Sequence, residues 1–573
     1  MKCKLVNENF KEEVLNNLLR ARGIAHPDIY LNPQRFSLQD PDDLDNIDKA
    51  AELLFDILDN GKKIWMVADC DCDGATSFAI IYNYIKEWYP NADITWNIHE
   101  HKEHGLSDFI EMLENSDIHY DLAILPDSSS NDFEFHERLA AIGTKVLVLD
   151  HHEVDMEISS NCILVNNQTS DGYVNKDLSG AGVAWQFCRY LDKKYGNSHS
   201  ENYIDLAAVG CCGDMMKITS YENRYIFKEG FSNIRNPFLK ALVEKQDFSM
   251  GGKINYTTVA FYIVPLLNAM IRSGTMEEKH RMYGAFVEGD KMVPSNKRGA
   301  NGTFERLAIE SARECTNARS RQNRTIEAAM DQLEIKIHKH DLLQNKILFI
   351  RLDEENFPPE INGLIAMKLS AKYKRPTLIG RLNDEGFIRG SGRGLANCEI
   401  TSFRDFLENS GFFEYTAGHA QAFGHSIANA NLDAFHNYAN EVLKDLDFNE
   451  DVIEVNFERI AADQDLYSLV MTLGDCPEVW GGGCPEPRIY VKDINITADD
   501  VTIMGKNKDT VKITKFGVSY IKFHAKDLIE DLQEFKEMQI EIVGRANVNE
   551  WMGNQTPQIF VENYQIKNGF LAF

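Results

Sequence analysis

The sequence lacks several features that would assign it to a particular class of protein. Its 573 residues contain no apolar run near the ~18 residues that a membrane-spanning helix needs. The first residues, MKCKLVNENFKEEV, lack the apolar centre of a signal peptide. The 11 cysteines show neither the spacing of a disulfide framework nor that of a zinc site, which favours reduced thiols. We therefore expect a cytoplasmic protein with no membrane partner.

Positive charge is also scarce. The chain has 60 Lys and Arg against 88 Asp and Glu, a formal net charge of −28. Because nucleic-acid binders are usually basic, this balance argues against a polyanionic substrate. Binding uses one local groove, however, and bound divalent cations reverse the local field. One basic segment, residues 297–324, has seven Lys and Arg against three Glu, so a nucleic-acid substrate stays open.

What the sequence does contain is an alternation of short apolar runs with helical stretches, beginning near residue 63. This alternation predicts a parallel sheet with helices on its faces. Residues 302–335 read as one long polar helix, and a second α/β pattern follows it. From about residue 450, five or six short alternating strands suggest a small β-barrel, of which the OB-fold is one type. Residues 1 to about 60 read as helical.

The stretch VADCDCDGATS (67–77) puts Asp69, Asp71 and Asp73 at every second position after an apolar run. If the strand continues, a two-residue spacing places the three carboxylates on one side of it. Crowded carboxylates repel each other and stay ionised most easily around a cation. Cys70 and Cys72 would then face the other way and pack as small hydrophobes. Zinc–thiolate ligation by these cysteines is the alternative.

Three further segments end in acid or histidine. DLAILPD ends on Asp127, TKVLVLDHH carries Asp150, His151 and His152, and LAAVGCCGD ends on Asp214. Sites of open α/β sheets form at the carboxyl ends of the strands, so we expect these side chains to meet. Any single aspartate here could be a helix cap instead. Oxygen-rich donors with imidazole suit Mg²⁺ or Mn²⁺, and so many donors predict two ions that clamp a phosphoryl displacement.

These motifs, in this order, resemble those of the DHH phosphoesterase superfamily, and within it the RecJ family of single-strand-specific exonucleases. The resemblance extends over nearly the whole chain through LSGAGVAW (178–185), VPLLNAMIR (264–272), GSGRG (390–394), AGHAQAFG (417–424) and NVNEWMGNQTPQIFVENYQI (547–566). The chain departs from the family at Ala417, where GGH is usual. It also lacks the usual glycine after Asp127 and the usual proline after Asp214.

The resemblance implies a role for each matching position. Asp71, Asp73, Asp127, His151 and Asp214 match metal ligands, and Asp69 lies in or beside the metal site. His152 matches the residue that contacts the scissile phosphate, and Asp150 is expected to orient its neighbours. Phosphate-contacting positions are matched by Arg272, Ser391, Arg393 and His419. Gly390, Gly392 and Gly394 would let backbone N–H groups approach a phosphate, with Arg393 forking onto two oxygens.

The domains expected from this resemblance follow the sequence pattern. They are N-terminal helices and a DHH phosphoesterase domain (1–290), a linker and long helix (291–340), a DHH-associated domain (341–448) and an OB-fold-like domain (449–573). In the last domain, lysines and the aromatic residues Tyr490, Tyr520, Phe523 and Trp551 are candidates for holding a single strand. The alternative is that these aromatics belong to the core of the barrel.

The function implied is a metal-dependent exonuclease that hydrolyses single-stranded DNA from the 5′ end, in DNA repair or recombination. Its cofactors would be two Mn²⁺ or Mg²⁺ ions. Its partners would be single-stranded DNA and, as proteins, a single-stranded-DNA-binding protein or a helicase. Two alternatives are a DHH phosphodiesterase of short oligonucleotides or cyclic dinucleotides and a non-catalytic relative from replication. The barrel-like tail argues against a phosphodiesterase of small substrates. The intact ligand positions argue against a non-catalytic relative.

Overall fold

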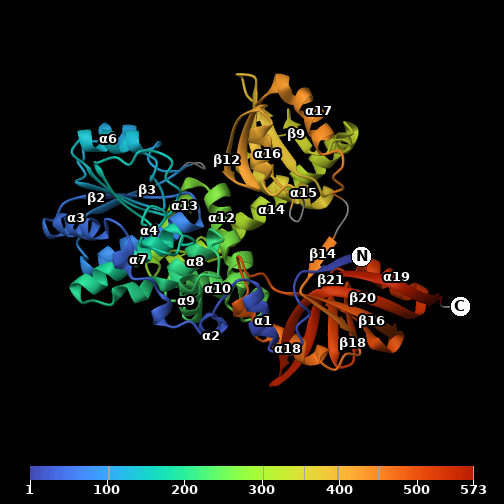
Figure 1. The fold of residues 1–573 in the computed structure, drawn as a ribbon. Coiled ribbons are helices and arrows are strands. Elements are labelled where there is room, and N and C mark those ends of the chain that lie inside the picture. Colours follow the sequence, from blue (N-terminus) through green and yellow to red (C-terminus); the bar gives the residue numbers. More distant parts are fainter. Residues whose placement is uncertain are drawn as a thin grey trace. The chain divides into compact units, whose positions relative to one another are not determined.

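The computed structural model describes residues 1–573 except 101–103, 301, 354, 356, 396–398, 449–451 and 572–573. Contacts divide the chain into two units. The first contains Met1–Leu267, His280–Ala312 and Val452–Phe573, and the second contains Asn268–Lys279 and Arg313–Asp451. Each unit has its own sheets and helices (Figure 1). No helix of the described residues is both long and apolar enough to cross a membrane.

The first unit contains the predicted parallel sheet. Its order is β3-β2-β4-β5-β6, and all four pairings are parallel. The strands are β2 (Ile64–Ala68), β3 (Ile94–Ile98), β4 (Leu122–Pro126), β5 (Lys145–Asp150) and β6 (Cys162–Asn166). Every residue of β2 and β4 is buried, because helices cover both faces of such a sheet and leave no polar side to its strands.

Helices connect and surround this sheet. Two of them matter most for the site, because α4 follows directly from β2 and α8 ends on the edge that β2 and β4 reach. The helices of this part are α1 (Val14–Ala21), α2 (Pro27–Leu31), α3 (Ile47–Asp59), α4 (Cys72–Trp88), α5 (Ile110–Glu114), α6 (Phe133–Ala141), α7 (Gly180–Tyr195), α8 (Ile204–Gly213), α9 (Tyr221–Ser232), α10 (Pro237–Met250) and α11 (Tyr256–Thr258). Two further helices, α12 (Val264–Ser273) and α13 (Met276–Glu288), are divided between the units, since Asn268–Lys279 belongs to the second.

The second unit is built on a five-stranded sheet of order β12-β13-β11-β10-β9. Only β9 and β10 pair in parallel. One face packs against α14 and α15 through Leu333, Ile365 and Ile379, and the other has its own core around Phe403 and Phe423. The elements are α14 (Leu307–Lys339), β9 (Leu348–Leu352), α15 (Asn362–Tyr373), β10 (Thr377–Leu382), β11 (Phe387–Arg393), α16 (Phe403–Asn409), β12 (Phe413–His419), β13 (Ala422–Ala428) and α17 (Leu432–Val442).

The long helix predicted at 302–335 is present but starts later. Residues Phe304–Arg306 form the short strand β8, which pairs with β7 (Met292–Pro294), and helix α14 runs from Leu307 to Lys339. Helix α14 supplies residues to both units.

The C-terminal part is a seven-stranded sheet of order β15-β16-β20-β21-β19-β18-β17. The prediction of five or six strands misses the short edge strand β15, and it makes β20 and β21 too short, because these strands of 17 and 18 residues contain register shifts such as that between Val543 and Gly544. A bulge interrupts the alternation by which a strand is recognised in sequence. The elements are β15 (Phe457–Ile460), α18 (Leu466–Gly474), β16 (Arg488–Thr497), β17 (Val501–Met504), β18 (Thr510–Lys515), β19 (Val518–Lys522), α19 (Lys526–Glu534), β20 (Phe535–Trp551) and β21 (Asn554–Leu571).

The first residues of the chain form a strand rather than a helix, in a two-stranded sheet that is separate from the seven-stranded one. Strand β1 (Lys2–Leu5) pairs in parallel with β14 (Val452–Val455). Close by, the buried Arg459 donates hydrogen bonds to the Phe10 carbonyl and to Asn9. The helical reading of residues 1–60 is therefore wrong at its start, since the partner of β1 lies about 450 residues away in sequence.

Candidate active site

The three aspartates that follow β2 do not continue a strand. The strand ends at Ala68, and Asp71 caps the N-terminus of α4 by accepting a hydrogen bond from the Gly74 N–H at 3.0 Å. The argument from a two-residue spacing is therefore wrong, because the backbone turns into a helix within a few residues. The turn is tight: a Cβ on Gly74 would lie 2.5 Å from the Asp69 Cβ. Asp69 and Asp73 are nonetheless buried at one site.

Both cysteines of this stretch are buried, as expected of small hydrophobes. Burial raises the pKa of Cys70 and that of Cys72, which disfavours the thiolate that a metal requires. Cys70 still lies in a group with Asp69 and His104 whose ligand atoms are within 4.8 Å of one another. Cys70 is therefore close to other possible zinc ligands, but its raised pKa favours the protonated thiol and so disfavours zinc–thiolate ligation.

Asp127 lies immediately after β4 in a left-handed backbone conformation, with φ 66°. Two residues on, Ser129 has φ 75°. Such angles cost a non-glycine residue on the order of 1 kcal/mol. The segment that lacks the family's usual glycine therefore keeps a left-handed turn with other residues. Gly180 at the start of α7 packs against the Asp127 carboxylate, because a Cβ there would lie 2.2 Å from Oδ1.

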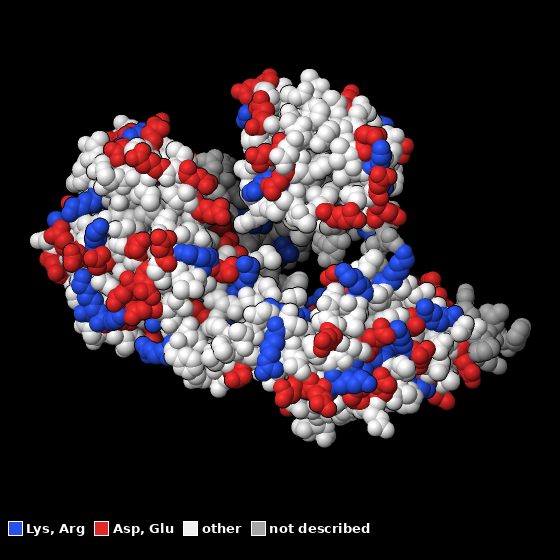
Figure 2. Space-filling model, viewed as in Figure 1, with Lys and Arg blue, Asp and Glu red and all other residues white. Residues whose placement is uncertain are grey.

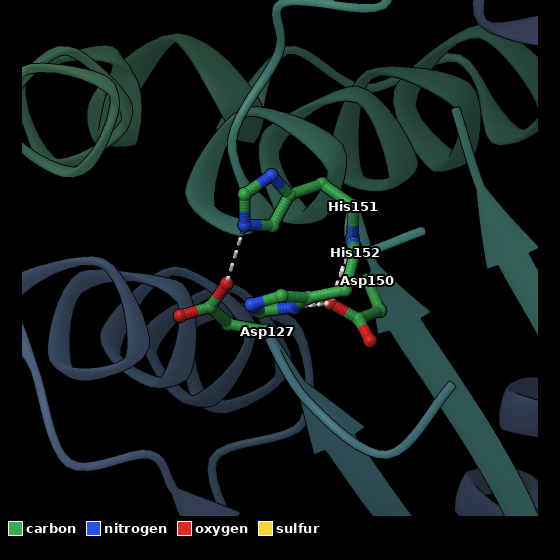
Figure 3. Close-up of side chains that lie close together, drawn as sticks. All are labelled: Asp127, Asp150, His151 and His152. Carbon is green, nitrogen blue, oxygen red and sulfur yellow. Dashed lines mark hydrogen bonds and ion pairs between the residues drawn. The ribbon is translucent and has the colours of Figure 1, made fainter. Parts of the chain in front are cut away.

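The two histidines after β5 point to different carboxylates (Figure 3). His152 Nδ1 lies 2.8 Å from Asp150 Oδ1, whereas His151 Nε2 lies 3.3 Å from Asp127 Oδ1. Asp150 also accepts a hydrogen bond from the His151 N–H at 2.7 Å. Burial alone would raise the pKa of Asp150, but His152 holds it below its usual range. Asp150 thus contacts both histidines, and its role in orienting them stays a prediction.

His151 is the point at which the acidic segments meet. Its Nε2 lies 3.6 Å from Asp214 Oδ2 and 3.8 Å from Asp73 Oδ2. Asp73 is fixed from behind, since it accepts hydrogen bonds from the Ser179 hydroxyl and from the N–H groups of Gly180 and Ala181. These donors form the N-terminus of α7, where partial positive charge favours a carboxylate.

The carboxylates and imidazoles fall into groups of the size that a metal ion takes. One group contains Asp73, His151 and Asp214, and another contains Asp69, Asp71 and Asp127. Burial, then the charge of Asp73, raises the pKa of Asp127 well above its usual range and that of Asp214 to about 8. Such shifts mark negative charge with too little compensation. Two divalent cations would supply it, and oxygen with imidazole fits Mn²⁺ or Mg²⁺.

Two functional candidates of the first unit were missed in the sequence, His99 and His104. His104 Nδ1 lies 2.5 Å from Asp69 Oδ2, and this contact raises the pKa of His104 to about 11. His99, fully buried, has Nδ1 2.8 Å from Asp108 and Nε2 3.8 Å from Asp69 Oδ1. The signal was the histidine-rich stretch HEHKEHG, which follows the end of β3 just as the acids follow β2, β4 and β5.

The four residues matched to phosphate contacts all lie in the second unit. Arg393 and Ser391 are two residues apart on β11 and so face the same side of the sheet. Arg393 is in register with Ala422 on β13, and Ala422 is in register with His419 on β12. Arg393 and His419 therefore lie in one cross-strand row. Their assignment as phosphate contacts stays a prediction.

The glycines of GSGRG have another task than the one predicted. A Cβ on Gly390 would lie 1.8 Å from the Ile379 carbonyl oxygen, and one on Gly392 would lie 2.5 Å from the Phe423 ring. Both glycines thus allow close packing within the sheet. Their strand position accounts for them without a phosphate, since β11 is hydrogen-bonded on both sides.

Guanidinium groups gather near this row of the second unit. After burial, the charge of Arg272 is the cause that lowers the pKa of Arg393 and of Arg319. The Arg393 side chain packs on α15, where a Cβ on Gly363 would lie 2.4 Å from Nη2. Arg319, on α14, bonds Gln322, which in turn donates to Ser273 next to Arg272. Cations held this close are suited to an anion with several oxygens.

Comparisons with known proteins agree with this arrangement. The profile of the DHH family, N-terminal domain, matches residues 63–211, and that of the RecJ OB domain matches 461–563. The chain is 35% identical over 580 residues to the putative prophage-derived single-strand DNA-specific exonuclease YorK of Bacillus subtilis, covering 99% of this chain and 98% of that protein. It is 23% identical to the single-stranded-DNA-specific exonuclease RecJ of the same organism, over 93% of this chain and 65% of that one.

Among solved structures, RecJ of Thermus thermophilus in complex with Mn²⁺ matches with a TM-score of 0.73 and 21% identity. That match covers 100% of this chain and 79% of the other. The same protein in complex with Mg²⁺ matches with a TM-score of 0.67. These likenesses establish the fold, and the C-terminal sheet is accordingly called the OB domain below.

Proposed function

Because this chain belongs to the RecJ-type single-strand-specific exonucleases of the DHH family, we propose that it hydrolyses the phosphodiester bonds of single-stranded DNA. Hydrolysis proceeds stepwise from the 5′ end and depends on two Mn²⁺ or Mg²⁺ ions. The assignment of the chain to this family rests on its 35% identity to a relative over nearly the full length of both chains. We place the activity in DNA repair or recombination.

The observation that carries the chemistry is the meeting of acidic groups from four segments around His151. Asp73, His151 and Asp214 would hold one ion, and Asp69, Asp71 and Asp127 the other. When bound, such ions stabilise the attacking and leaving oxygens of an in-line displacement at phosphorus. The carboxylates contribute by being fixed in advance, as with the three hydrogen bonds that Asp73 accepts.

His152 would contact the scissile phosphate. Its Nδ1 is engaged by Asp150, which leaves Nε2 to donate to a phosphate oxygen. The side chain is half exposed, in contrast to the buried His151. Asp150, buried and hydrogen-bonded to Ser130 as well, holds the imidazole in this orientation. Orientation by a carboxylate behind a histidine is what such sites commonly use.

The rest of the substrate would be held outside the metal centre. The guanidinium groups of Arg272 and Arg393 suit a backbone phosphate, with Ser391 on the same strand as Arg393 and His419 on β12 in the same cross-strand row. On the OB domain, Phe516 and Phe523 are exposed and available for stacking on bases. Tyr490 and Tyr520 are buried and belong to the core, and the side chain of Trp551 lies outside the described residues.

The net charge of −28 does not oppose this proposal, because acidic groups are spread widely. Figure 2 shows them scattered over the visible face of both units with Lys and Arg among them. An acidic average of this kind slows the approach of a nucleic acid more than it weakens a local cationic site. Binding of DNA should therefore depend strongly on salt and on the divalent cation.

The test is digestion of a single-stranded oligonucleotide labelled at either end, with Mn²⁺, with Mg²⁺ and with EDTA. A 5′ label is expected in mononucleotides from the first moments, whereas a 3′ label should persist in a ladder of shortening strands. EDTA should abolish both. Faster hydrolysis of cyclic dinucleotides than of single strands would replace the proposed substrate, and an inert chain that binds metal would identify a non-catalytic relative.

A further inference from the structure

The turn that presents Asp214 is strained. Asp214 follows the last residue of α8, and Met215 after it has a left-handed backbone with φ 56°. Met215 is three-quarters exposed, so its own side chain does little to hold that conformation. The left-handed conformation costs a non-glycine residue on the order of 1 kcal/mol, so a residue keeps it only where the surrounding structure holds it in place. The family's usual proline, which would stiffen this segment, is absent.

The start of the turn is held by the end of α8, where the Met216 N–H donates to the Cys211 carbonyl oxygen at 2.9 Å, and the rest of it is held by the OB domain. Three consecutive glycines, Gly481–Gly483, form a loop that we call the glycine loop. The Ile218 N–H donates to the Gly482 carbonyl oxygen at 2.8 Å, and Ile218 is fully buried. Residues 212–218 thus begin on a helix of the DHH domain and end on a hydrogen bond to the OB domain.

The glycine loop packs closely against the turn after Asp214 and against Tyr256, and no space is left for a side chain at Gly481 or Gly482. A Cβ on Gly482 would lie 2.9 Å from the Met216 carbonyl oxygen, 3.1 Å from that of Met215 and 2.7 Å from the Tyr256 hydroxyl. One on Gly481 would lie 2.7 Å from the Tyr256 ring. Since two of these neighbours are backbone atoms of the turn, a side chain at Gly482 must shift either the glycine loop or the segment that carries Asp214, and either shift changes their contact.

The loop is itself anchored. Gly481 and Cys484 exchange backbone hydrogen bonds of 2.8 and 3.0 Å. The preceding Trp480 is buried and donates to the Leu473 carbonyl at the end of α18. From the other side, the Tyr30 hydroxyl donates to the Val479 carbonyl at 2.7 Å. The position of the glycine loop is therefore set by the OB domain and by the N-terminal helices together.

We propose that the glycine loop positions Asp214 for metal binding, so that the OB domain is part of what builds the metal centre. The inference rests on the proposed function only in taking Asp214 as a metal ligand. Gly482 is a positioning residue that touches neither ion nor substrate. By reciprocity, binding of a metal ion at Asp214 stabilises the contact between the turn and the loop.

The first experiment measures Mn²⁺ affinity directly, by calorimetry or by the electron paramagnetic resonance of free Mn²⁺, for the full chain. Gly482→Ala should weaken binding at one site at least about 10-fold, the scale of effect when the support behind a metal ligand is removed. The control is Gly284→Ala on α13, whose Cβ would meet only Leu307 at an ordinary 3.6 Å. Unchanged affinity in a folded G482A protein overturns the proposal.

A double-variant cycle identifies the route of the effect. In an Asp214→Asn background, Gly482→Ala should cause no further loss of Mn²⁺ affinity, because the ligand that the loop positions is already removed. A full additional loss in the D214N background would mean that Gly482 acts elsewhere and would overturn the proposal.

The second measurement needs no variant and covers the case in which G482A does not fold. Hydrogen exchange of the unaltered protein is compared with and without Mn²⁺. Mn²⁺ should slow exchange in peptides spanning 480–485 as well as in those spanning 210–220. Slowing confined to 210–220 refutes the coupling. Neither readout uses hydrolysis, so an inactive chain that still shows both effects would refute the proposed function and leave this inference standing.

Discussion

Two clusters of the molecule are opposite in charge and in construction. One is the metal centre, formed by the candidate metal ligands of the first unit. The other is the arginine row, formed by Arg272, Arg319 and Arg393 of the second unit. In the metal centre, short carboxylates are placed by the ends of β2, β4, β5 and α8 and are mostly buried. In the arginine row, long side chains from α12, α14 and β11 bring guanidinium groups close together. Each cluster gathers groups of like charge, so a cation would stabilise the first and an anion the second.

The comparison is tested most strongly at Asp73. Asp73→Asn should reduce the rate of hydrolysis at saturating single-stranded DNA by at least about 1,000-fold, because a two-ion site contributes several kcal/mol. Asparagine is preferable to alanine, since Asp73 accepts three hydrogen bonds at the start of α7. The measurement is single-turnover digestion together with Mn²⁺ binding.

The stability of this variant in EDTA serves as the control. Removal of one negative charge from the crowded site should leave the melting temperature of the metal-free protein unchanged or higher. Retention of more than about a tenth of the activity would contradict the two-ion assignment.

The next effect is expected at the arginine row. Arg393→Ala should raise the KM for single-stranded DNA by about 10- to 100-fold, the worth of one or two hydrogen bonds to a charged group. The Mn²⁺ midpoint should not move, because no carboxylate changes. The slope of log affinity against log salt should fall by about 0.7 for each phosphate that the variant no longer neutralises.

The matched control is Arg389→Ala on the same strand. Arg389 is exposed and pairs with Glu385, away from the row of Arg393 and His419. A shifted metal midpoint with an unchanged KM in R393A would mean that GSGRG serves the metal centre rather than a phosphate.

The smallest expected effect concerns the OB domain, which carries neither cluster. Phe523→Ala should weaken binding of long single strands by about 5-fold or more, as removal of stacking on one base does. Cleavage of very short oligonucleotides should be unaffected. Phe523 is exposed and packs at a tilt against Phe560, with ring centroids 5.5 Å apart.

Phe248→Ala is the comparison variant, because Phe248 is also an exposed ring, on α10. An equal loss of activity on short and long strands in F523A would show that the ring supports folding instead of the substrate. Deletion of the whole OB domain is a poorer test, because on the inference above it also removes the support of Asp214.

The sequence predicts that the acidic residues lie close together for a physical reason. Parallel strands end at one edge, so Asp127, Asp150 and His151 can be placed near one another without knowing the turns. For Asp71 and Asp73 the reason given is wrong, since Asp71 caps helix α4 and Asp73 lies in its first turn. His104 was missed because its contact with Asp69 depends on the path of a loop, which strand periodicity does not describe.

Contacts between parts of the chain that are far apart in sequence could not be predicted from the sequence. The glycines of GSGRG suggested a phosphate loop, whereas close strand packing against Ile379 and Phe423 explains two of them. Tyr490 and Tyr520 alternate like surface residues of a strand, but both are buried, as are their neighbours Ile489 and Ile521 on the opposite face. No local sequence pattern explains the three glycines at 481–483. Their role can be inferred only from their contact with the turn after Asp214.

The pairing of β1 with β14 has a consequence for the order of events during synthesis. Strand β1 leaves the ribosome first, yet the strand that it pairs with follows about 450 residues later. At ~5–20 residues per second, β1 waits roughly 20 to 90 s for its partner. During that time the DHH sheet, whose strands all lie within residues 64–166, can fold. The segment of β1 is thus synthesised before the DHH sheet but pairs only after the strands of that sheet have been made.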